Sequence, residues 1–169
     1  MKSNQVYSFK IKGFEPFEGL LRAKGTSRTL IEYIPVDYVL DGYRLILSDK
    51  ILGAIRDKQE LQVERVLMLK NQLQRSPIDV KLDDDFSLFE QFLVSKQLIQ
   101  IYPKDESFSL LGQVENINRA SFNLRLLDSE GQWLAIHNFP FHKVKIIEIE
   151  TNYIESLNLL KSFNNQNNL

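Results

Sequence analysis

The sequence contains no cysteine and few of the residues that usually carry enzyme chemistry. Among its 169 residues are 2 His, 1 Trp, 7 Gly and 5 Pro. Without cysteine there can be no disulfides, thiolate nucleophiles or thiolate metal sites, which fits a reducing compartment. No apolar run approaches the roughly 18 residues of a membrane-spanning helix, and the first residues lack the apolar segment of a signal peptide. We therefore expect a soluble, cytoplasmic protein with no membrane contact.

The charge is almost balanced over the whole chain but not along it. The formal net charge of -1 and the pI near 6.1 give no overall field that would attract a polyanion. Residues 1–75 carry 13 Lys and Arg against 9 Asp and Glu, whereas residues 76–169 carry 8 against 13. A basic binding face, head-to-tail packing of the two halves, and chance are all explanations of this asymmetry.

The first half has the pattern of a small β-barrel. Tyr7, Phe9 and Ile11 alternate with polar residues, which is the period of a half-buried strand. Four more β segments follow up to residue 55, with Gly19 suited to a bend and a turn at Asp41-Gly42. Apolar residues then recur at helical spacing over residues 57–74. Ser76-Pro77 ends the helix, so the sequence predicts a first unit over residues 5–75.

The second half repeats this order after an additional short helix. Asp83, Asp84 and Asp85 precede an apolar helical face, where carboxylates complement the first turn; they lack the spacing of a calcium loop. Five strands follow up to residue 150 and an amphipathic helix over 151–163, which gives a second unit over residues 83–163. The last strand changes phase at Ile146 and Ile147, so we expect a bulge or a bend there. The polar tail 164–169 should fray.

Two spacings indicate that the units are related. Gly19 and Ile51 are as far apart as Gly112 and Val144, and each span leads into a helix that ends in Leu-Lys. The expected fold is therefore mainly β with flanking helices (α+β), formed by two small SH3-like β-barrel units in tandem.

The segment LLGQVENINRASFNLRLLDSEG, residues 110–131, resembles the first motif of the Sm-like family. That motif has a glycine in the second strand, an Asn or Asp in the next loop and an Asn early in the third strand; Gly112, Asn118 and Asn123 match these positions approximately. The family's second motif has no match in HNFPFHKVKIIEI, and the first half has the glycine without the Asn. The resemblance implies an open SH3-like barrel, ring assembly through edge strands, and often RNA binding. The fourth and fifth strands of such a barrel leave edges that need a partner.

Single-stranded RNA is the alternative partner to protein. Bases are held by stacking planes and by groups such as Asn, and cations follow the backbone. The residues that could provide this set are Asn118, Arg119, Asn123 and Lys143, with the basic turn of Arg22, Lys24 and Arg28. The competing interpretation makes these a polar turn, an outward strand position and a solvated rim.

Three residues are candidates for a protein interface: Trp133, Val144 and Tyr153. Tryptophan often anchors interfaces, but Trp133 could equally pack beneath a helix. If Val144 lies on an exposed edge, its replacement by proline should break assembly and leave most of the β structure.

Catalysis has little support in this sequence. There is no glycine-rich phosphate loop, and His137 and His142 have no recognised ligand spacing. We expect no metal and no cofactor. The hypothesis is a non-enzymatic, Sm-like self-assembling or partner-binding module that forms a homo-oligomer; the alternative is an RNA or single-stranded nucleic-acid binding protein, and the third is a hydrolase or metalloenzyme.

Overall fold

The computed structural model describes residues 1–167, and over this range the chain is mainly β. It forms ten strands, three α-helices and two short 3₁₀ turns. This confirms the mainly β fold with flanking helices that the sequence predicted. The strands are β1 (Gln5–Ile11), β2 (Phe17–Lys24), β3 (Arg28–Ile34), β4 (Tyr43–Leu47), β5 (Ile51–Ile55), β6 (Leu98–Tyr102), β7 (Leu110–Ile117), β8 (Ser121–Leu127), β9 (Trp133–Pro140) and β10 (Ile146–Ile149). The helices are α1 (Lys58–Leu69), α2 (Asp85–Ser95) and α3 (Asn152–Asn167), and the 3₁₀ turns are η1 (Ser48–Lys50) and η2 (Phe141–Lys143).

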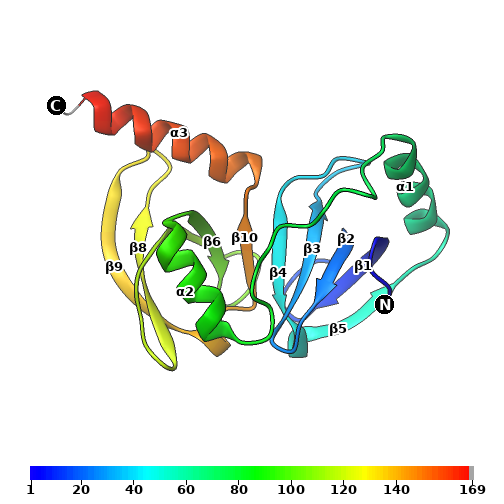
Figure 1. Cartoon of the computed structure of the whole chain (residues 1–169), viewed down its shortest axis with the longest axis horizontal. Helices are drawn as coiled ribbons and strands as arrows, with labels where there is room; N and C mark the ends of the chain where they lie inside the picture. Colours follow the sequence, from blue (N-terminus) through cyan, green and yellow to red (C-terminus); the bar gives the residue numbers. More distant parts are fainter. Residues whose placement is uncertain (168–169) are drawn as a thin grey trace.

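All ten strands belong to one antiparallel sheet that does not close on itself. Their order is β5-β1-β2-β3-β4-β10-β6-β7-β8-β9. The first half supplies five neighbouring strands and the second half the other five, so the molecule has two lobes side by side (Figure 1). In each lobe the last strand pairs with the first, and the other strands follow in chain order.

Several elements of the two halves match at a constant spacing. Phe17 and Leu110, which begin β2 and β7, are 93 positions apart. The same 93 positions separate both ends of β3 from those of β8 and both ends of η1 from those of η2. The register shifts of β2 against β3 and of β7 against β8 also lie 93 positions apart. A position in the second half is called below the counterpart of the position 93 residues before it.

Gly112 has a steric reason to be glycine. A Cβ atom at this position would lie 2.2 Å from the backbone oxygen of Arg125 on β8. The backbones of β7 and β8 therefore approach too closely for any side chain at this position.

The halves are joined by β4 and β10, which pair antiparallel. Ile146 lies opposite Ile46, and Glu148 opposite Arg44. Of the expected bulge or bend, a bulge is absent from Ile146–Ile149, because their pairings with β4 and β6 have no register shift. The strand is apolar on both faces because it lies in the interior of the sheet: Ile147 belongs to the core of the second half, and Ile146 to that of the first.

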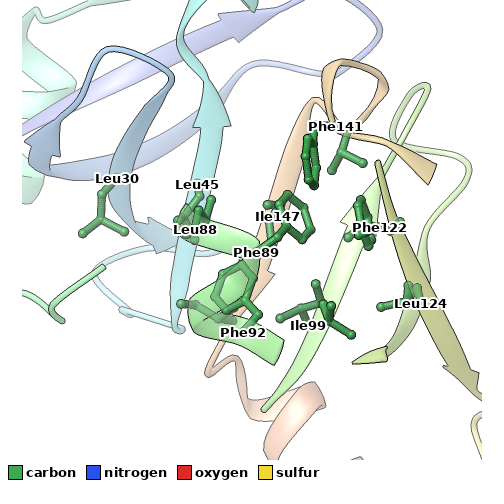
Figure 2. Packing of buried hydrophobic residues seen from close by; sticks show 14 residues of the cluster. Leu30, Leu45, Leu88, Phe89, Phe92, Ile99, Phe122, Leu124, Phe141 and Ile147 are labelled. Carbon is green, nitrogen blue, oxygen red and sulfur yellow. The ribbon is translucent and has the colours of Figure 1, made fainter. Parts of the chain in front are cut away.

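The largest core spans both halves (Figure 2). Phe89 of α2 stacks on Phe122 and Phe141, with ring centroids 4.0 and 5.0 Å apart. Leu30 of β3 and Leu45 of β4 pack into the same cluster from the first half. Because α2 packs where both halves contribute side chains, its burial stabilises the arrangement of the two halves as well as the second half itself.

The three adjacent acids before α2 have separate structural roles. Asp84 is the N-cap, and its carboxylate accepts from the backbone N–H of Ser87 at 2.8 Å. Asp83 accepts from the backbone N–H of Thr26, and Asp85 from Arg28. The interpretation as caps of a first helical turn holds for Asp84, and the other two acids bind the β2–β3 turn.

Helix α3 extends to Asn167, so residues 164–167 of the expected frayed tail are helical. Residues 168–169 lie outside the described part of the chain. In residues 1–167, no helix has the length and apolar character to cross a membrane.

Candidate functional site

Two of the predicted phosphate-binding arginines are buried in ion pairs. The Arg22 side chain is 1% exposed; it donates from Nε to Glu32 at 2.7 Å and from its terminal nitrogens to the carbonyls of Gln72 and Leu73. Arg28 is fully buried and donates to Asp85 and to the carbonyl of Val144 at 2.7 and 2.8 Å. The prediction of a basic binding turn is therefore wrong at both arginines, because their buried guanidinium groups already donate to carboxylates and backbone carbonyls of this chain. Lys24, beside them in the sequence, is exposed.

The asparagines of the predicted RNA site are bound to their own turn and strand. The side-chain oxygen of Asn118 accepts from the backbone N–H groups of Ala120 and Ser121, each at 2.9 Å. Asn123 accepts at 2.8 Å from Asn138 on β9. These bonds are those of a polar turn and a cross-strand pair.

Arg119 and Lys143 remain as exposed cations at one end of the second half. A hydrogen bond from the backbone N–H of Phe141 to the carbonyl of Ala120 holds the β7–β8 turn beside η2. The structure therefore brings these two cations to the same end of the sheet, but with both asparagines already bonded.

The interface candidates occupy three different environments. Trp133 is partly buried and packs against the cluster beneath α3, with the cations of Arg125 and Lys161 over its ring at 5.0 and 5.6 Å. Val144 is fully buried, and the strand that follows it lies inside the sheet, so its expected place on an exposed edge is wrong. Tyr153 is 51% exposed.

The two free edges of the sheet are β5 and β9. In the sheet of the described residues, β5 pairs only with β1, and β9 only with β8. Both expose large apolar side chains: Leu52 and Ile55 on β5 are 61% and 58% exposed, and Leu134 and Ile136 on β9 are 50% and 55% exposed. Unpaired N–H and C=O groups beside exposed apolar side chains are what a strand needs to bind another strand.

The pairing of β4 with β10 contains a buried ion pair. Arg44 donates from Nε to Glu148 at 2.7 Å, and both side chains are 6% exposed. The Arg44 guanidinium lies over the rings of Tyr33 and Phe17, 3.5 and 4.3 Å from their centroids. Tyr102 donates to the other oxygen of Glu148, and burial together with that carboxylate raises the pKa of its hydroxyl. We call the pairing of β4 with β10, together with this ion pair, the inner junction.

Loops at one end of the sheet extend the inner junction. The Lys145 ammonium donates to the carbonyls of Lys12 and Lys104, one in each half. The backbone N–H of Glu106 donates to the carbonyl of Gly13 at 3.1 Å, and its carboxylate accepts from the N–H of Glu15. These bonds hold the β1–β2 turn against the β6–β7 loop.

An open hollow, lined mostly by apolar residues together with Gln100 and Ser109, lies near the β9 edge. It measures about 170 Å³, and its lining includes Leu110, Leu126, Leu134 and Tyr153. Leu110 and Leu126 are the counterparts of Phe17 and Tyr33, the two rings that contact Arg44 at the inner junction. Two residues that line the hollow thus occupy the positions of the two rings around Arg44, with leucines in place of aromatic rings.

Sequence reasoning predicted that small barrels leave edges but could not identify which strands remain free. Only the pairing of β4 with β10 does that. Leu134 and Ile136 are apolar residues at alternate positions of the predicted strand. They gave a partial signal, because apolar side chains that lie outside a core often mark a binding surface.

No cluster of three or more residues that could hold a metal ion occurs in residues 1–167. His137 and His142 are both exposed.

No family model, curated protein or solved structure matches this chain.

Proposed function

We propose that this protein is a non-enzymatic self-assembling module built from two Sm-like β-barrels in tandem. In this proposal the free edges β5 and β9 bind protein strands by adding to the sheet. One observation carries it: each terminal strand of the ten-stranded sheet of the described residues has one free edge and exposes large apolar side chains.

The inner junction supports this mode of binding. It already joins a fourth strand of one half to a fifth strand of the other, and the two free edges are a fifth and a fourth strand of the same two halves. The same two kinds of strand that pair with each other inside the chain are therefore free at the two ends of the sheet. Charged residues and short strands usually protect edges from pairing, whereas β9 has eight residues and a largely apolar exposed side.

The test is a measurement of mass. Size-exclusion chromatography with light scattering, over a range of protein concentrations, should give a defined oligomer of the 19.8 kDa chain. A single species at the mass of one chain at every concentration would overturn the proposal.

Nucleic-acid binding is the second proposal, and it rests on Arg119 and Lys143, which lie exposed at the same end of the second half. Absorbance at about 260 nm, recorded during the same chromatography at low salt, tests it, because contacts with phosphate weaken steeply as salt rises. Excess absorbance that disappears in high salt, and in an Arg119→Glu/Lys143→Glu variant, would favour this function over assembly alone. Protein free of nucleic acid would count against it.

A further inference from the structure

The inner junction specifies which partner the free edges fit. Residues of β4 have counterparts in β9, and residues of β10 have counterparts in β5. Resting on the proposed self-assembly, we infer that β9 of one chain pairs antiparallel with β5 of a second copy, in the register of the inner junction. In that register Gly53 lies opposite Phe139, and Ile55 lies opposite His137, because their counterparts Ile146 and Glu148 lie opposite Ile46 and Arg44.

The chemistry of the two junctions differs at the central position. Glu148 at the inner junction is replaced by Ile55, and its partner Arg44 by His137. The rings around Arg44 are replaced by Leu110 and Leu126, which line the open hollow. An apolar side chain on β5 thus meets an apolar hollow beside β9, where the inner junction places a charge against a charge. Ile55 fills the hollow and is the residue that determines the fit.

The same difference prevents the wrong pairing. If β5 of a second copy replaced β10 at the inner junction, Ile55 would stand where Glu148 stands and leave the buried Arg44 without its carboxylate. A buried unpaired charge is strongly unfavourable. The ionic inner junction therefore selects β10, and the apolar outer junction selects β5.

Proline limits the length of the outer junction. At the inner junction the backbone N–H of Leu47 donates to the carbonyl of Lys145 at 2.8 Å. The counterpart of Leu47 is Pro140, which has no N–H, so the outer ladder loses this hydrogen bond and ends at Phe139. Each chain contributes β5 to one neighbour and β9 to the other, so the assembly is head-to-tail.

The experiment introduces a charge on each side of the outer junction. Ile55→Glu and Leu134→Glu both alter exposed side chains, so each variant should keep the urea midpoint of the wild type. Each should weaken association by about 100-fold or more, since a carboxylate would be buried in an apolar contact. Leu69→Glu is the matched control: Leu69 is 73% exposed and lies on α1, outside both edge strands, so the mass of the assembled variant should equal that of the wild-type assembly.

Mixing the two variants tests the polarity of the assembly. The Ile55→Glu chain keeps an intact β9 edge, and the Leu134→Glu chain keeps an intact β5 edge. The mixture should form a 1:1 dimer, whereas each variant alone stays a monomer. An Ile55→Glu/His137→Arg variant recreates the pair of Glu148 with Arg44 and should regain part of the assembly.

The outcomes separate this inference from the proposed function. A wild-type oligomer that persists in Ile55→Glu overturns the inference and leaves self-assembly standing through another contact. Monomeric single variants that do not form a dimer on mixing overturn the head-to-tail register. A wild-type monomer at every concentration overturns the proposed function and the inference together.

Discussion

The two halves share a strand order, yet one pair of counterpart positions carries the same ion pair with its charges exchanged. In the first half Arg22 pairs with Glu32 at 2.5 Å, with side chains 1% and 8% exposed. In the second half the counterparts are Glu115 and Arg125, whose closest charged atoms are 3.9 Å apart with side chains 44% exposed for Arg125 and 34% for Glu115. Both halves thus have a cross-strand pair of opposite charges at this position, but the pair is buried in the first half and exposed in the second.

The reason for this difference is the chain that follows each helix. After α1, the turn at Gln72 and Leu73 runs over Arg22, and its carbonyls accept from the guanidinium. In the second half Arg125 instead lies over the ring of Trp133, at the edge of the α3 contact. The helices themselves dock on corresponding strands: α1 packs on Val6, Leu20 and Ile34 of β1, β2 and β3, and α3 on Leu98, Leu111 and Leu127 of β6, β7 and β8. The two halves therefore differ in what covers this ion pair, and not in the strands that their helices cover.

The largest effect is expected at the inner junction, the contact that the free edges lack. Arg44→Ala should lower the free energy of unfolding by about 3–5 kcal/mol, because it leaves Glu148 buried without its partner. Urea unfolding followed by circular dichroism measures this change. The double variant Arg44→Leu/Glu148→Leu is the control, and it should lose much less, since no charge stays buried. Equal losses in the single and double variants would mean that packing, and not charge, holds the junction.

The next prediction sharpens the comparison of the two ion pairs. Arg22→Ala should cost about 3 kcal/mol, because Glu32 is left buried and the carbonyls of Gln72 and Leu73 lose their donor. Arg125→Ala should cost less than about 1 kcal/mol, because exposed pairs contribute little. Both values come from the same urea titration. Similar costs would show that burial does not distinguish the halves.

A small effect is also expected in α2, an element with no equivalent before β1. Asp84→Ala should lower stability by about 1 kcal/mol at neutral pH through loss of the N-cap. The N–H of Ser87 donates to the Asp84 carboxylate and lowers its pKa, so the wild-type advantage is present above the ordinary pKa of aspartate and is lost as pH falls through the lowered value. Asp84→Asn keeps a capping oxygen and removes the titration. Thermal unfolding at a series of pH values checks this, and a difference independent of pH would contradict it.

Much of the fold and part of the candidate site could be predicted from local sequence. The alternation of Tyr7, Phe9 and Ile11 identified a strand, and these side chains share one core. The aspartates before α2 predicted its beginning, and the equal separations of Gly19 from Ile51 and of Gly112 from Val144 predicted two related halves. Edge strands were expected to be the interacting surface, but Val144, which was expected on an edge, is buried next to an interior strand.

The rest depended on partners distant in the sequence. Arg22 and Arg28 read as a basic turn because nothing nearby shows that Leu73 and Asp85 will pack against them. The phase change in β10 suggested a bulge or a bend, because periodicity alone cannot distinguish a strand covered on both faces from an irregular one.

By itself the sequence determined the strands, the helices and their repeated order, because side-chain periodicity and capping act over a few residues. The tertiary structure alone decided which strands pair across the halves and which stay free. Arg44 and Glu148 are 104 positions apart, and their pairing is the contact that covers β4 and β10 and leaves β5 and β9 exposed. The physical reason is that a strand's pattern fixes the direction of its side chains, whereas its neighbour in the sheet is fixed by packing and charge from distant parts of the chain.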